Sequence, residues 1–199
     1  GATVTIDAIG CQTEIARTIV GGEGHYLLAV KENQPALHKD LAATFAEVAD
    51  DLAEKFQAKI LILGGPNDRP VSEIVLGRMK KEAVLHEGTV PLREMMAMIS
   101  LCNLCITNDS GAMHIASALG IPYVTLFGPT RPEAAYPGGE AGRALYHSVN
   151  CSPCWFRVCP VNHHCMSAIS VQEVIKAAEE VMNRPNPEGK VNGNKKGAA

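Results

Sequence analysis

The sequence has few aromatic residues and no excess of positive charge. Aromatic residues make up 5% of its 199 residues, and the formal net charge is -3. Proteins that hold single-stranded nucleic acid stack bases on aromatic side chains, and a basic field is needed to gather DNA or anionic lipid. We therefore expect no nucleic-acid partner.

The chain also lacks a long apolar run. No stretch approaches the ~18 consecutive apolar residues of a membrane-spanning helix, and no signal-peptide pattern is present. Residue 1 is Gly and not Met, so we expect the natural start to be missing or removed. Seven cysteines form an odd set, four of them within residues 151–165. We predict a cytoplasmic chain whose thiols are mostly reduced.

Strand-like runs alternate with helix-like periodicity along the chain. The runs that predict strands lie at residues 3–6, 25–30, 59–63, 83–85, 104–107 and 123–127. Apolar spacing of three and four predicts helices at residues 11–20, 37–56, 71–81, 92–101, 110–119 and 171–182. Most of residues 128–170 should be loop, and the tail from Arg184 should be disordered. This alternation predicts an α/β fold, a three-layer, Rossmann-like, mostly parallel sheet.

One predicted strand stops abruptly at Asp109-Ser110-Gly111, where the next helix begins. The first N–H groups of a helix have no intrahelical partner, and the helix dipole favours an anion there. Gly111 leaves room for a phosphate, Ser110 adds a hydroxyl donor, and Asp109 could accept hydrogen bonds from sugar hydroxyls. A sugar linked to a diphosphate fits this mixture. The alternative is a plain N-cap by Asp or Ser with no ligand.

Four ordered motifs carry a resemblance to a known family. They are LILGGPNDR at 61–69, CITNDSGAMHIASALGIP at 105–122, LFGPT at 126–130 and CSPCWFRVCPVNHHCM at 151–166. Together they resemble the ADP-heptose:lipopolysaccharide heptosyltransferases, which have the two-domain GT-B architecture, and the cysteine block is most similar to the heptosyltransferase II branch. The resemblance covers residues 45–182 and implies the donor-binding half of such an enzyme. It also implies an ADP-heptose donor, a lipopolysaccharide-core acceptor and no cofactor.

The resemblance implies roles for individual residues. Asp109 would contact the heptose, Ser110 and Gly111 would bind the diphosphate, and His114, one turn into the helix, would lie near the phosphates. The alternative for His114 is an ordinary helix residue.

The nucleoside end of the donor is matched by two further positions. Asp68 corresponds to an acidic residue that holds the adenosine ribose, and Val90 falls where an apolar residue packs on adenine. As alternatives, Asp68 could be a solvated loop carboxylate and Val90 a core residue.

The amino-terminal residues carry a second, different resemblance. TVTIDAIGCQTEIARTIVGGEGHYLLAVKENQPALHKDL, residues 3–41, is similar to the catalytic-core segment of DDE insertion-sequence transposases. The resemblance implies a metal-binding role for Asp7, and Lys31 and Gln34 match a segment after the next strand. The other two acidic residues of a two-metal site have no counterpart, so this segment is interpreted as a fusion scar.

The cysteine block could hold a metal. Its spacing is C-x2-C-x4-C-x5-C, which includes one tight pair, whereas strong zinc signals have two. We predict reduced, metal-free thiols in a packed loop, with zinc or an iron–sulfur centre and a disulfide as alternatives. Cys102 and Cys105 are expected to be buried apolar residues. The four cysteines of the block are Cys151, Cys154, Cys159 and Cys165.

These interpretations divide the chain into three parts. Residues 1–41 are the transposase-derived segment, predicted to join the sheet; 42–183 are the nucleotide-sugar-binding domain; and 184–199 are the tail. The leading hypothesis is a donor domain of lipopolysaccharide core assembly, inactive alone because the acceptor domain and its catalytic base are not recognisable. Membrane association is expected only for a full-length parent. The rival hypotheses are a transposase-derived DNA-binding remnant and a folded fusion product without activity.

Overall fold

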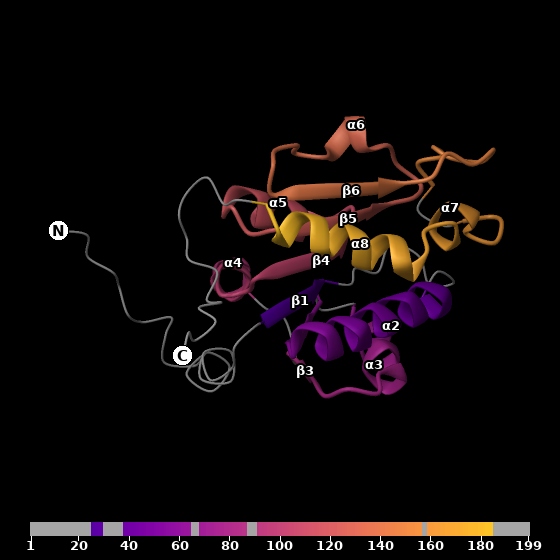
Figure 1. Cartoon of the computed structure of the whole chain (residues 1–199). Coiled ribbons are helices and arrows are strands. Elements are labelled where there is room, and N and C mark those ends of the chain that lie inside the picture. The colour runs from indigo at the N-terminus through magenta and orange to yellow at the C-terminus, as the bar shows by residue number, and fades with distance from the viewer. Residues whose placement is uncertain (1–24, 30–37, 65–67, 87–90, 157–158, 185–199) are drawn as a thin grey trace, which may run out of the picture.

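The computed structural model describes residues 25–29, 38–64, 68–86, 91–156 and 159–184 (Figure 1). Within these ranges six strands form one sheet in the order β3-β2-β1-β4-β5-β6, and every neighbouring pair is parallel. The predicted α/β class with a parallel sheet is confirmed. The strands are β1 (His25–Ala29), β2 (Lys59–Leu63), β3 (Ala83–Leu85), β4 (Leu104–Asn108), β5 (Tyr123–Phe127) and β6 (Gly142–Tyr146).

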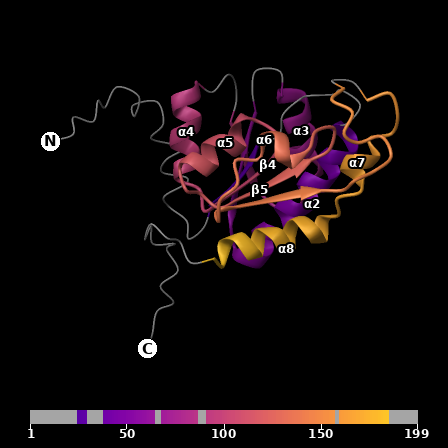
Figure 2. The same cartoon turned by 90° about the horizontal axis from the view of Figure 1, so that it is seen from above.

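Helices cover both faces of the sheet (Figure 1, Figure 2). The helices of the described ranges are α2 (His38–Phe56), α3 (Arg69–Arg78), α4 (Leu92–Ser100), α5 (Gly111–Ala118), α6 (Pro132–Ala135), α7 (His164–Ser167) and α8 (Val171–Met182). Helices α2, α3, α7 and α8 pack on one face, and α4 and α5 pack on the other. None of the helices in the described part of the chain is long and apolar enough to cross a membrane.

The inner strands carry apolar side chains on both faces, because each face of the sheet packs against a separate hydrophobic core. In β2, Ile60 and Ile62 point into the core under α2 and α8, whereas Leu61 and Leu63 point into the core under α4 and α5. Successive side chains of a strand face opposite sides, so a doubly covered sheet requires a continuous apolar run. This is why the KILIL run could be recognised as a strand.

Strand β1 lies in the middle of the sheet. It pairs with β2 through five residues, His25 to Ala29, and with β4 through four, Tyr26 to Ala29. The prediction that this run joins the same parallel sheet as β2 is confirmed for residues 25–29. The predicted strand at 3–6 and helix at 11–20 lie outside the described residues.

The segment between β5 and α8 is more regular than predicted. It contains β6 and the short helices α6 and α7, where mostly loop was expected. Strand β6 was not predicted because its sequence, GRALY, begins with a glycine and belongs to a partly exposed edge strand. That glycine packs on a ring: a Cβ at Gly142 would lie 2.2 Å from Cζ of Tyr123. Arg184 is also described, and its Nη1 donates to the carbonyl of Glu140 at 2.7 Å.

Helix α8 begins with a capping box. The Ser170 hydroxyl accepts a hydrogen bond from the backbone N–H of Glu173 at 3.3 Å, and the Glu173 carboxylate accepts one from the backbone N–H of Ser170 at 2.8 Å. The same carboxylate lies 2.9 Å from Nε2 of His147, just beyond β6. Bonds from the Ser170 backbone and hydroxyl, then from His147, hold the pKa of Glu173 below its usual value.

Candidate functional site

The strand order identifies one edge of the sheet as the place for a ligand. Chain connections run outward in opposite directions from β1 and β4, which are adjacent in the sheet. Ligands of open parallel sheets bind at the carboxyl ends of the strands, at such a switch point. Asp109-Ser110-Gly111 directly follows β4 there and leads into α5.

Asp109 is held at the switch point from two sides. Its backbone N–H donates to the carbonyl of Leu126 in β5 at 3.1 Å. Its half-buried carboxylate accepts a hydrogen bond at Oδ2 from the Thr130 hydroxyl at 2.7 Å. The carboxylate therefore has a fixed orientation at the end of β4.

Ser110 occupies the N-cap position of α5 but does not cap it with its side chain. Its hydroxyl lies 2.9 Å from the hydroxyl of Thr107, a fully buried residue of β4. The alternative of a plain side-chain N-cap by Ser110 is thus wrong in this structure. The first backbone N–H groups of this eight-residue helix therefore have no side-chain cap from Ser110, and these groups and the helix dipole favour an anion.

The start of α5 is open. Gly111 is exposed, and a Cβ built on it would meet no atom within 4 Å. His114 is exposed one turn further along the helix, whereas the intervening Ala112 and Met113 are buried in the core. The sequence predicted an anion-binding pocket at this junction, with His114 facing it. Asp109, Ser110, Gly111 and His114 are not buried, and the pocket and the binding of an anion there stay predictions.

Of the two residues predicted to bind the nucleoside, the structure describes Asp68 but not Val90. Asp68 precedes α3 and is 7% exposed, so the alternative of a solvated loop carboxylate is wrong. Its predicted contact with a ribose is not tested. Val90 lies outside the described residues.

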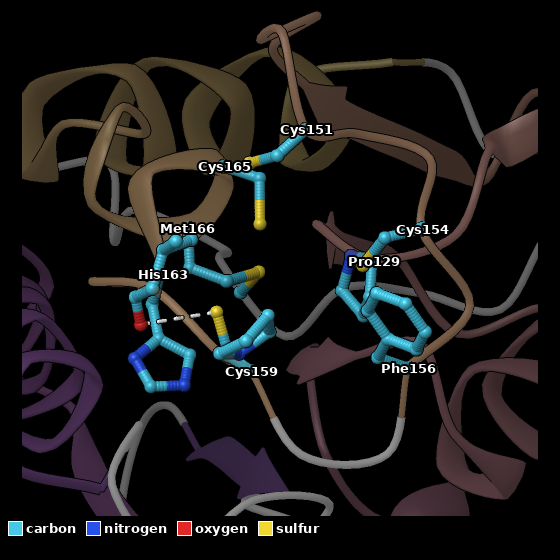
Figure 3. A pocket seen from close by; sticks show the side chains of 10 residues that line it. Pro129, Cys151, Cys154, Phe156, Cys159, His163, Cys165 and Met166 are labelled. Carbon is cyan, nitrogen blue, oxygen red and sulfur yellow. Dashed lines mark hydrogen bonds between the residues drawn. The ribbon is translucent and has the colours of Figure 1, made fainter.

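The four clustered cysteines meet at a cavity of about 230 Å³ (Figure 3). Cys151 and Cys165 lie together on one side of it, and Cys154 lies beside Phe156 and Pro129 on the other. All six cysteines of the described ranges are free thiols. Among the described residues, no three His, Cys, Asp or Glu side chains are arranged to hold a metal ion. Metal-free thiols remain a prediction for the protein in solution.

Burial keeps the inner thiols protonated. It raises the pKa of Cys102 to about 12 and that of Cys105 well above its usual value, and both side chains are in the core under α4 and α5, as predicted. Burial raises the pKa of Cys165 too, assisted by the neighbouring Cys151. These thiols are poor nucleophiles at neutral pH.

Sequence reasoning missed Thr107 and Thr130. Both hydroxyls contact predicted site residues, Thr107 reaching Ser110 and Thr130 reaching Asp109. Thr130 lies 21 residues from Asp109, and only the adjacency of β4 and β5 brings them together. The LFGPT motif was the available signal, because it places Thr130 just beyond a strand end.

The fold and the switch-point site define a class, an α/β domain with the parallel sheet found in one half of a GT-B glycosyltransferase. Within that class, the chain belongs to glycosyltransferase family 9 (heptosyltransferase), whose family model matches residues 12–164. The match includes residues 12–41, so it gives no support to a separate origin of that stretch.

Individual relatives agree with this assignment. The lipooligosaccharide heptosyltransferase 2 of Campylobacter jejuni is 29% identical over 147 residues, which are 71% of this chain and 46% of that protein. The crystal structure of a glycosyl transferase family 9 protein from Veillonella parvula matches 86% of this chain and 50% of its own, with a TM-score of 0.69 and 30% identity. The structure of E. coli ADP-heptose LPS heptosyltransferase II matches with a TM-score of 0.67 and 21% identity, over 90% of this chain and 52% of its own. The chain spans about half the length of these relatives.

Proposed function

We propose that the chain binds an ADP-linked sugar, ADP-heptose in the leading case, as the donor-binding half of a heptosyltransferase of lipopolysaccharide core assembly. The observation that carries the proposal is the open, uncapped start of α5 at the switch point, beside the fixed carboxylate of Asp109. A helix N-terminus favours the diphosphate, and an oriented carboxylate favours sugar hydroxyls.

In the proposed complex the diphosphate lies against the backbone of Gly111. The Thr107 hydroxyl donates its one proton to the carbonyl of Asn108 at 3.0 Å, so it accepts from Ser110 in the free chain. In the complex the Ser110 proton turns from Thr107 to a phosphate oxygen. Asp109 accepts from the heptose hydroxyls, and His114 lies near the phosphates on the exposed face of α5.

The nucleoside would extend towards β2. Strands β4 and β2 are separated by β1 alone, so their carboxyl ends lie about 10 Å apart. Asp68, in the segment between β2 and α3, would accept from the ribose hydroxyls, and Val90 would pack on adenine.

Transfer needs parts that the donor motifs do not supply. In the proposed reaction an acceptor hydroxyl of the lipopolysaccharide core displaces ADP at the anomeric carbon, without an electron-carrying cofactor. An acceptor site and a general base must then be placed within reach of that hydroxyl. No catalytic residue is assigned, because the motifs cover the donor alone. We expect no heptose transfer by the chain on its own and a cytoplasmic location; transfer above a no-enzyme control would contradict the first expectation.

Thermal unfolding with and without ligand tests donor binding. ADP at 100 times its dissociation constant stabilises the folded state by about 2.7 kcal/mol, which raises Tm by roughly 5–10 °C for a domain of this size. Gly111→Ala should abolish the shift, because the new methyl group occupies the space of the phosphate.

Gly77→Ala is the matched control, because Gly77 likewise has no atom within 4 Å of a built Cβ. It should keep the shift. Absence of a shift in the unmodified chain, or equal shifts in the two variants, would refute the proposed site.

A transposase origin of residues 3–41 is a second, separate proposal. Its support is the resemblance of that segment, including Asp7, Lys31 and Gln34. Sequencing of the chromosomal locus is the test. We expect a transposase reading frame upstream of codon 41, and a continuous glycosyltransferase frame there would refute the fusion.

A further inference from the structure

We propose that Thr130 is a positioning residue of the donor site. Its hydroxyl orients the Asp109 carboxylate towards the donor sugar, and the cysteine-rich loop, residues 151–156, holds the turn that carries it. The inference rests on the proposed donor binding and assigns a role to parts of the chain that the donor motifs leave unexplained.

The hydrogen bonding of Asp109 separates its two carboxylate oxygens. Oδ2 accepts from Thr130 at 2.7 Å, whereas the described residues offer no donor to Oδ1. A carboxylate fixed through one oxygen presents the other in a constant direction. Oδ1 is therefore the oxygen available to a sugar hydroxyl, and its direction depends on Thr130.

The turn before Thr130 is held by three hydrogen bonds from the cysteine-rich loop. The Ser152 hydroxyl donates to the carbonyl of Gly128 at 2.5 Å. The backbone N–H groups of Cys154 and Trp155 both donate to the carbonyl of Pro129, at 3.0 and 2.9 Å. Trp155 makes its bond with a left-handed backbone, φ 58°. Such conformations persist where the surrounding structure imposes them.

Helix α7 also contacts this turn. A Cβ at Gly128 would lie 2.2 Å from Sδ of Met166 and 3.2 Å from Sγ of Cys165, so the helix packs directly on the glycine backbone. Both side chains are buried. The two peptide units before Thr130 are thus fixed from the loop and from α7, which leaves Thr130 little freedom to move away from Asp109.

The residues around the cysteine cavity therefore help to fix the position of Thr130 in the donor site. Pro129 lines the cavity as well as forming the turn, and the thiols of Cys154 and Cys165 lie around it (Figure 3). The cavity therefore adjoins the Asp109 carboxylate through a single residue, Thr130.

Calorimetric titration of the full chain with ADP and with ADP-heptose tests the inference. The unmodified chain should bind ADP-heptose more tightly than ADP, because Asp109 contacts the sugar. Thr130→Val keeps the shape of the side chain and removes the donor. It should weaken ADP-heptose binding about five- to tenfold, less than the loss of a direct hydrogen bond to a charged group, because Thr130 acts through Asp109. ADP binding should change less than twofold. Thr130→Ser should restore the preference for ADP-heptose.

Thr125→Val is the matched control. Thr125 is fully buried in β5, and its hydroxyl has no partner among the described residues. It should alter neither affinity. The inference is overturned if Thr130→Val leaves both affinities unchanged, if it lowers both equally, if Thr130→Ser fails to restore the preference, or if the unmodified chain does not prefer ADP-heptose. If the unmodified chain binds neither ligand, the proposed function fails and the inference falls with it.

Discussion

Replacing Leu27 by proline should strongly destabilise the domain, because β1 is bonded on both sides. Leu27 pairs with Leu61 of β2 and with Cys105 of β4. Proline removes one ladder donor and leaves a buried carbonyl on a neighbouring strand without its partner. A lost bond and an unsatisfied buried group are each worth roughly 1–3 kcal/mol. The expected loss is about 3–5 kcal/mol, out of a total stability of about 5–15 kcal/mol for a typical domain.

An edge strand supplies the matched comparison. Val84 of β3 also pairs with Leu61, but β3 has a neighbour on one side alone within the described sheet. Val84→Pro should cost roughly 1 kcal/mol, one net hydrogen bond. Urea unfolding followed by circular dichroism gives both midpoints. Equal midpoints for Leu27→Pro and Val84→Pro, or an unchanged midpoint for Leu27→Pro, would show that β1 is not the central strand.

Five further predictions concern the rest of the domain. Ser170→Ala should lower stability by about 1 kcal/mol through loss of the cap on α8, measured by urea unfolding. The pKa of Glu173 is lowered in the folded state, so its contribution to stability is present above the usual value of 4.5 and is lost as pH falls below it. Glu173→Gln should therefore make stability less dependent on pH in the acid range. Gly142→Ala should destabilise by about 1–3 kcal/mol through the clash with Tyr123. Gly77→Ala, in the exposed last turn of α3, should instead stabilise, by up to roughly 0.5–1 kcal/mol. Similar unfolding midpoints for the two variants would contradict this packing. Iodoacetamide should label the exposed Cys151 in the native protein and should react with the buried Cys102 and Cys105 only on unfolding. Elemental analysis should find no bound zinc. One zinc per chain that is lost in Cys151→Ala would refute the metal-free prediction.

Burial and periodicity determined which elements could be predicted. Strands β2, β4 and β5 are buried along most of their length and are therefore apolar runs that end at turn residues. Strand β6 is an edge strand with one buried residue, and its sequence begins with Gly142 and Arg143, so its apolar stretch is short. The short helices α6 and α7 have four residues each, too few for a periodic pattern.

The candidate site was predictable only where its residues are consecutive. The junction at Asp109-Ser110-Gly111 could be placed from a strand end followed by a helix. Its contacts with Thr107 and Thr130 depend on side-chain direction and on the order of strands. In the same way, the cysteine spacing suggested a cluster, but the position of the cysteines around a cavity lined by Pro129, next to Thr130, required the fold.

The central position of β1 has a consequence for synthesis of the chain. Its first partner, β2, ends at Leu63, whereas its second partner, β4, is complete only at Asn108. At about 5–20 residues per second, a ribosome takes roughly 2–9 seconds to add residues 64–108. During that interval one edge of β1 has no native partner, and an unpaired strand edge is a template for pairing with another chain. The interval before β4 emerges is therefore when nascent copies are most open to aggregation, and a chaperone that covers this edge would act there.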